Sequence, residues 1–162
     1  MRLSELALEQ PRGTYFGIKP TDETVDSLIN FIRQHDVPDP IDREKVHSTV
    51  VYSRTFCSAR PLGDIDPPLV GKFAQYNLFP RNVEEDPTPM CLVLEFDCPE
   101  LTQRHDELVT KYGASHDFPD FKPHLTLTYD AGDFDYENLP PYKGPLEFHY
   151  EYSEPLNTNW VE

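Results

Sequence analysis

The chain has 162 residues, a formal net charge of −15 at pH 7, 38% hydrophobic residues and 12% aromatic residues. This length and apolar content predict one globular domain, residues 1–162, and argue against a disordered chain. The negative charge argues against long nucleic acids as partners, because they require a basic surface, but a local basic pocket can still bind a small anion.

The cysteines and the N-terminus bear on the cellular compartment. Cys57, Cys91 and Cys98 form no CxxC pair, and their odd number leaves no closed set of disulfides. The first ten residues include two glutamates and no long apolar run, a composition that indicates neither a signal peptide nor a membrane anchor. We therefore expect a cytoplasmic protein that has no membrane partner.

The first half of the chain predicts a strand, a helix and a second strand. Residues 13–19 have a pattern typical of a strand, which ends at Pro20. Thr21 can then cap a helix that runs to about residue 35, in which apolar residues recur at helical spacing. Prolines in residues 37–40 stop this helix. The next strand contains the segment His47–Tyr52.

The middle of the chain predicts a long loop, two strands and a second helix. Residues 55–68 are rich in Pro, Gly, Asp and Arg and are expected to form the loop. Strands are expected at residues 70–79 and 90–97, joined by the acidic segment 84–89 as a hairpin or meander. Pro99 is well placed to begin a helix, which Gly113 ends.

The second half repeats the plan of the first. A proline-bearing loop, residues 118–123, leads to the strand segment His124–Tyr129, and a last strand is expected at residues 146–152. The order of strand, helix, proline-bearing loop and His-x-Thr strand therefore occurs twice. We interpret the chain as an imperfect duplication of two βαβ-like halves, whose equivalent strands meet near a pseudo-twofold axis.

The repeated motif is His-x-Thr, found as His47-Ser48-Thr49 and as His124-Leu125-Thr126. Residues i and i+2 of a strand point to the same side, so each motif directs an imidazole and a hydroxyl to one face, while its middle residue points away. If the two strands lie side by side, four side chains meet in one cleft. These candidate catalytic residues are His47, Thr49, His124 and Thr126.

Two histidines with an ordinary pKa near 6.5 suit concerted acid–base chemistry, in which one removes a proton and the other donates one. Two hydroxyls can bind the non-bridging oxygens of a phosphate, so a phosphodiester fits this set. Which histidine is the acid stays open, because near-twofold symmetry makes the roles exchangeable.

Two simpler interpretations compete with this one. A single His-x-Thr strand is ordinarily structural, but a second copy in the matching position favours a site. The sequence contains no HExxH motif and no close Cys/His cluster, and we expect a site without metal or other cofactor. The remaining histidines are scattered and are expected to be structural or at the surface: His35, His105, His116 and His149.

The paired motif, one copy in each half of a duplicated α+β domain, resembles the 2H phosphoesterase superfamily over about residues 14–152. The resemblance implies the duplicated, LigT-like 2H fold: two pseudo-twofold-related lobes of antiparallel strands, with flanking helices and a central cleft. It also implies cleavage of cyclic phosphodiesters and cyclic phosphates by two histidines.

Three residues outside the motifs resemble those of the phage anti-CBASS nucleases within that superfamily. They are Tyr15, in the strand before the first helix, and Glu154 and Trp160, near the C-terminus. The resemblance implies that Tyr15 and Trp160 stack on bases and that Glu154 contacts a base edge. Without it, Tyr15 would be a candidate core residue and Trp160 a seal at the edge of the core.

The resemblance further implies an activity. The chain would open 3′–5′ bonds of cyclic di- and trinucleotide immune signals, such as 3′,3′-cyclic GMP–AMP, in the cytoplasm of an infected bacterium, and so counteract CBASS defence. The nucleophile would be water or the adjacent ribose 2′-hydroxyl. Base preference, ring size and oligomeric state stay open, with a monomer favoured.

Other functions stay open as well. One is a 2H phosphodiesterase acting on RNA 2′,3′-cyclic phosphate ends, although the charge of −15 counts against long RNA. Another is a non-catalytic sponge for cyclic nucleotides, which would need no acid–base pair. An acidic decoy that binds a protein would leave the duplicated motif unexplained.

Overall fold

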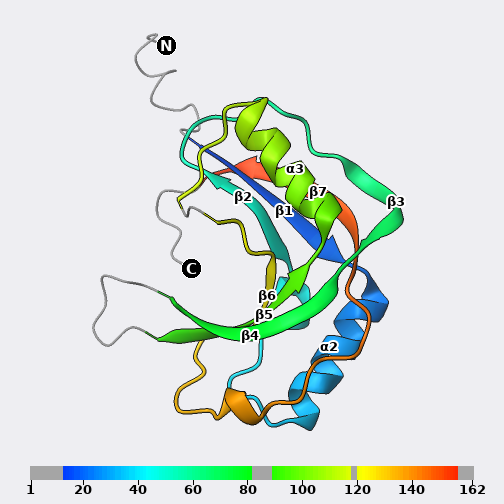
Figure 1. The fold of residues 1–162 in the computed structure, drawn as a ribbon, viewed down its shortest axis with the longest axis vertical. Coiled ribbons are helices and arrows are strands. Elements are labelled where there is room, and N and C mark those ends of the chain that lie inside the picture. Colours follow the sequence, from blue (N-terminus) through cyan, green and yellow to red (C-terminus); the bar gives the residue numbers. More distant parts are fainter. Residues whose placement is uncertain (1–12, 82–88, 118–119, 157–162) are drawn as a thin grey trace.

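The computed structural model describes residues 13–81, 89–117 and 120–156, and these residues form two antiparallel sheets, two α-helices and two short 3₁₀ helices. Figure 1 shows α3 lying across the four-stranded sheet and α2 near the beginning of β4, away from the end that leads to the grey trace. The four-stranded sheet has the order β2-β1-β7-β3, with strands Ser48–Ser53, Thr14–Pro20, Glu147–Pro155 and Gly63–Val70. The three-stranded sheet has the order β4-β5-β6, with strands Lys72–Pro80, Met90–Asp97 and His124–Thr128. The helices are α2, Asp22–Gln34, and α3, Pro99–Thr110, and the 3₁₀ helices are Arg43–Lys45 and Tyr136–Asn138.

The duplication is visible in the strand pairing. In the first half, β1 and β2 pair antiparallel and α2 connects them; in the second half, β5 and β6 pair antiparallel and α3 connects them. Each pair contains one shift of register. The equivalent strands β2 and β6 belong to different sheets but contact each other. In the segment before β2, the Ile41 N–H donates to the Leu127 carbonyl of β6 at 2.9 Å. The predicted α+β duplication is confirmed.

Local sequence explains why α2 forms where the sequence predicted it. The Thr21 hydroxyl accepts a hydrogen bond from the Thr24 backbone N–H, and the buried face of the helix carries Val25, Leu28 and Ile32. The Thr24 hydroxyl in turn accepts from the Glu147 N–H at 3.0 Å. The start of α2 is therefore tied to the start of β7.

The prediction of a loop over residues 55–68 was wrong in its second part, because β3 begins at Gly63. This strand lies at the edge of the sheet, and its pairing with β7 is interrupted between Asp64 and Leu69. Prolines at positions 67 and 68 fit this interruption, since an edge strand tolerates residues that cannot donate to the ladder. The edge position explains why the sequence pattern resembles a loop.

The predicted strand at residues 70–79 is in fact the end of one strand and the start of another. Val70 ends β3, Gly71 follows, and β4 begins at Lys72. A Cβ atom at Gly71 would lie 2.7 Å from Cδ2 of Phe96, so the bend requires glycine. The last strand runs to Pro155, past the predicted residue 152, because Thr14 of β1 pairs with it there. Residues 84–88 of the predicted acidic connection lie outside the described residues.

One hydrophobic cluster takes residues from both sheets and both helices. Phe96 of β5 and Phe148 of β7 stack at 5.0 Å between ring centroids and join the two sheets. Such an aromatic pair contributes about 0.5–1.5 kcal/mol beyond its buried area. Among the described residues, no helix combines the length and the apolar character needed to cross a membrane.

Candidate functional site

The two His-x-Thr motifs lie at the starts of the equivalent strands, with His47 immediately before β2 and His124 opening β6. In both motifs the histidine and the threonine are partly exposed, whereas the residues that alternate with them are buried. The buried ones are Ser48, Val50, Leu125 and Leu127. Each histidine therefore shares the more open face of its strand with its threonine.

Both histidines are anchored in the same way. The His47 Nδ1 lies 2.7 Å from the Lys45 carbonyl oxygen, and the His124 Nδ1 lies 2.9 Å from the Lys122 carbonyl oxygen. Because a carbonyl only accepts, each Nδ1 carries a hydrogen and donates it. This fixes the tautomer of each neutral ring and leaves Nε2 as the nitrogen that exchanges protons.

The first motif is connected to Tyr15. The Tyr15 and Thr49 hydroxyls are hydrogen-bonded at 3.0 Å, and the Tyr15 ring meets the His47 ring edge-on at 6.2 Å. The side chain is only 3% exposed, and it is not part of the main hydrophobic cluster. Tyr15 therefore contacts both functional side chains of the first motif, the Thr49 hydroxyl and the His47 ring.

A pocket of about 680 Å³ opens beside His47. Tyr15 and Glu154, which pair across β1 and β7, both line it, so the structure brings two of the three base-contact candidates to His47. Trp160 lies outside the described residues, and Thr49, His124 and Thr126 do not line this pocket. The other aromatic and basic residues that line the pocket were not predicted from the sequence: Tyr129, Tyr150, Tyr152, Lys19, Lys45 and Arg81.

The second motif is supported from two sides. The Phe79 ring meets the His124 ring edge-on at 5.0 Å. The loop before the motif is held by His105 of α3, which is buried. The His105 Nδ1 donates to the Val50 carbonyl of β2 at 2.7 Å, and the His105 ring stacks on Phe121 in that loop at 4.0 Å between ring centroids. Burial lowers the pKa of His105. His105 thus joins β2 to the loop that precedes His124, which is the structural one of the two roles expected for it.

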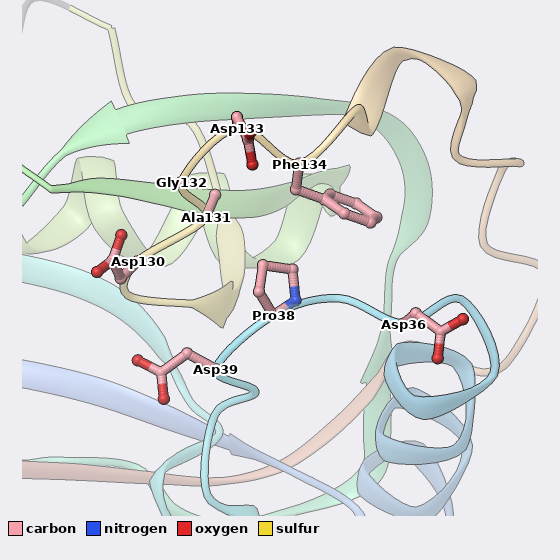
Figure 2. Close-up of a pocket in the computed structure, with 8 residues that line it drawn as sticks. All are labelled: Asp36, Pro38, Asp39, Asp130, Ala131, Gly132, Asp133 and Phe134. Carbon is pink, nitrogen blue, oxygen red and sulfur yellow. The ribbon is translucent and has the colours of Figure 1, made fainter.

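A second pocket, of about 520 Å³, lies between the loop after α2 and the loop after β6 (Figure 2). Four carboxylates border it together with Pro38 and Phe134, and no basic residue is among its described lining. These carboxylates are Asp36, Asp39, Asp130 and Asp133. An anionic ligand would be repelled there, so the pocket beside His47 is the better phosphate site.

Over the described ranges, no group of three or more His, Cys, Asp or Glu side chains is placed to hold a metal ion. The expectation of a site without a metal stays a prediction.

Comparisons with known proteins extend these observations. A sequence model of the family described as anti-CBASS protein Acb1 matches residues 12–162. The anti-CBASS protein Acb1 of Salmonella phage S16 is 35% identical over 153 residues, covering 93% of this chain and 92% of that protein. The protein of the same name from Enterobacteria phage T4 is 33% identical over 150 residues, covering 93% and 92%.

Solved structures show the same fold at low sequence identity. Escherichia coli LigT in complex with 3′-AMP superposes with a TM-score of 0.58 at 17% identity, covering 94% of each chain. LigT in complex with ATP gives a TM-score of 0.55 at 16% identity, covering 94% of this chain and 93% of LigT. The predicted LigT-like 2H phosphoesterase fold is confirmed.

Proposed function

The chain belongs to the family of the anti-CBASS protein Acb1, and on this premise we propose that it is a phosphodiesterase that opens cyclic di- and trinucleotide immune signals and so counteracts CBASS defence. The observation that carries the proposal is the pair of identically anchored histidines, His47 and His124. A protein that only binds nucleotides has no need of two imidazoles with matching tautomers.

The proposed reaction uses the two Nε2 atoms in opposite senses. One unprotonated Nε2 takes the proton of the attacking oxygen, which belongs to water or to the adjacent ribose 2′-hydroxyl, as that oxygen bonds to phosphorus. The bond between phosphorus and the 5′-oxygen of the neighbouring nucleotide breaks, and the protonated Nε2 of the other histidine gives its proton to that leaving oxygen. Thr49 and Thr126 donate hydrogen bonds to the non-bridging oxygens, where negative charge grows.

The residues that line the pocket beside His47 favour a small nucleotide as the ligand. It combines aromatic rings with three basic side chains, Lys19, Lys45 and Arg81, in a chain whose net charge is −15. Tyr15 and Glu154 border it, in keeping with the base-contact roles proposed for them and for Trp160. The ligand is therefore a compact anion with bases, as a cyclic oligonucleotide is.

Three further points belong to the proposal. Residues 1–162 form one domain, which the shared hydrophobic core supports. The protein acts as a monomer on a ligand dissolved in the cytoplasm of the infected bacterium. It needs no metal ion or other cofactor.

Incubation of the protein with 3′,3′-cyclic GMP–AMP in EDTA, followed by mass spectrometry, tests this function. We expect linear products. Depletion of the free ligand with intact cyclic ligand recovered after denaturation would instead identify a sponge. Cleavage of 2′,3′-cyclic nucleotides alone would identify an enzyme of RNA ends.

A further inference from the structure

Three residue pairs across β1 and β7 form a ladder along the pocket beside His47, here called its floor, and all of these residues except Gly17 line the pocket. Tyr15 lies opposite Glu154, Gly17 opposite Tyr152, and Lys19 opposite Tyr150. Alternate residues of a strand share a face, so these pairs lie on the opposite side of β1 from its core residues, Phe16 and Ile18. The ladder is about 13 Å long at roughly 3.3 Å per residue. Only its Tyr15–Glu154 end has a role in the function proposed above.

Gly17 shapes the middle of the ladder. A Cβ atom at this position would lie 2.5 Å from the Tyr152 hydroxyl oxygen and 2.9 Å from Cε1 of Tyr15. Tyr152 therefore lies across the bare backbone of β1, with its ring 6.1 Å from that of Tyr15. Because any other residue would displace this ring, the arrangement depends on glycine.

Lys19 occupies the far end of the ladder. Its Nζ lies 5.4 Å from the centroid of the Tyr152 ring, which holds the ammonium group over the floor of the pocket. The ion pairs found among the described residues do not include Lys19. Lys19 thus lines the pocket with no described carboxylate within ion-pair distance of its Nζ, although Glu44 and Glu154 line the same pocket. Beside it, Tyr150 is 38% exposed.

The side chains of the ladder suit a ligand that has more than one phosphate and more than one base. A cyclic oligonucleotide carries one phosphate for each nucleotide, so a ring with one phosphate at the histidines presents another some distance away. A lysine is a suitable point charge for that phosphate, and an exposed tyrosine offers a face for a base.

We propose that the Lys19–Tyr150 end of the pocket is a subsite for the second nucleotide of a cyclic substrate. Lys19 Nζ donates hydrogen bonds to the phosphate that is not cut, and the Tyr150 ring stacks on the second base. This inference rests on the proposed function, because it assumes a cyclic oligonucleotide at the histidines. It adds a determinant that separates such a ring from a nucleotide with a single phosphate.

Calorimetric binding to the His124→Ala protein tests the subsite without turnover. With Lys19→Gln added, the Kd for 3′,3′-cyclic GMP–AMP should rise about tenfold or more, because a charge-assisted hydrogen bond is lost. The Kd for 3′-AMP, which has one phosphate, should stay within about twofold. Lys19→Arg should restore most of the affinity for the cyclic ligand. Tyr150→Ala should weaken binding of the cyclic ligand alone, by about fivefold or more.

Lys111→Gln is the matched control, because its Nζ also lies 5.4 Å from a tyrosine ring centroid, that of Tyr112, and neither residue lines the pocket. It should leave both Kd values unchanged. The subsite is wrong if Lys19→Gln leaves the affinity for the cyclic ligand intact or weakens both ligands equally. That result would leave the proposed function standing if the wild-type protein still cleaves the cyclic ligand. Absence of any cyclic-ligand binding to the His124→Ala protein would overturn the subsite, whereas the function would fall only if the wild-type protein formed no linear product.

Discussion

At the scale of single residues, the chemistry of the site depends on two backbone carbonyls. Alternation along a strand is a local rule, and it was enough to predict that each histidine shares a face with its threonine. The direction of the Lys45 and Lys122 carbonyls depends on the backbone path before each strand, so the sequence did not predict the anchoring of the two Nδ1 atoms. Both motifs have a lysine two residues before the histidine, and it is the backbone carbonyl of that lysine that accepts the hydrogen bond.

Tyr15→Phe should slow cleavage while preserving the fold. The substitution keeps the ring and removes the hydroxyl that is hydrogen-bonded to Thr49 at 3.0 Å. Loss of a hydrogen bond of about 1 kcal/mol that orients Thr49 corresponds to about a fivefold lower kcat. Steady-state kinetics with 3′,3′-cyclic GMP–AMP measures it, with Tyr112→Phe as the control outside the pocket. An unchanged kcat would show that Thr49 needs no support from Tyr15.

At the scale of elements, the sequence predicted best what is determined locally. The Thr21 cap and the apolar spacing of α2 lie within one segment, and the predicted helix is confirmed. The strand β3 was missed because it depends on pairing with β7, some eighty residues further along the chain. The pocket floor was only half predicted for the same reason, since Lys19 meets Tyr150 and Tyr152 through the register of β1 and β7.

A buried ion pair joins α3 to β7. Arg104 donates to both carboxylate oxygens of Glu151, at 2.8–3.2 Å, and also to the Arg60 carbonyl. Glu151 is 1% exposed and also accepts from the Leu62 N–H. Burial alone would lower the pKa of Arg104, but the hydrogen bonds and charge of Glu151 raise it above its ordinary value.

Glu151→Gln should therefore destabilise the protein strongly. It leaves the buried Arg104 charge with the partly exposed Glu107 carboxylate as its remaining ion-pair partner, and breaking a buried pair costs on the order of 3–5 kcal/mol in the free energy of unfolding. Urea denaturation measures the loss. Asp117→Asn is the comparison, because it removes the exposed partner of Arg54 and should barely move the midpoint. Equal effects of the two substitutions would contradict this account of the α3–β7 contact.

The connection that His105 makes between β2 and the loop before His124 should weaken in acid. Burial lowers the pKa of His105 and the neighbouring His116 opposes its charge, whereas Asp106 favours it. The unfolded chain therefore binds this proton more readily, and stability is lost as the pH falls below the ordinary histidine pKa of about 6.5. The drop in Tm between pH 7.5 and pH 5 should be smaller in His105→Gln than in the wild type. The exposed control, His149→Gln, should keep the wild-type drop, and equal drops in all three proteins would refute the assignment.

At the scale of the whole molecule, the net charge and the charged residues of one pocket together limit the size of the ligand. The net charge of −15 argues against long nucleic acids as partners, while three basic side chains line the pocket beside His47 and favour a small anion as its ligand. The limit on the size of the ligand rests on composition alone and stays a prediction, whereas the two-lobed fold that the duplicated motif predicted is confirmed. The single core shared by both sheets supports one domain, so the urea curves above should show a single transition.

The central claim is that His47 and His124 together cleave a cyclic phosphodiester. The most direct test is the rate at which linear product forms from 3′,3′-cyclic GMP–AMP, followed by mass spectrometry for the wild type, His47→Ala, His124→Ala and the exposed control His149→Ala. Loss of a general acid or base predicts a kcat lower by about 10²–10⁴-fold in each motif variant and wild-type turnover in the control. Full cleavage by both motif variants would contradict the account.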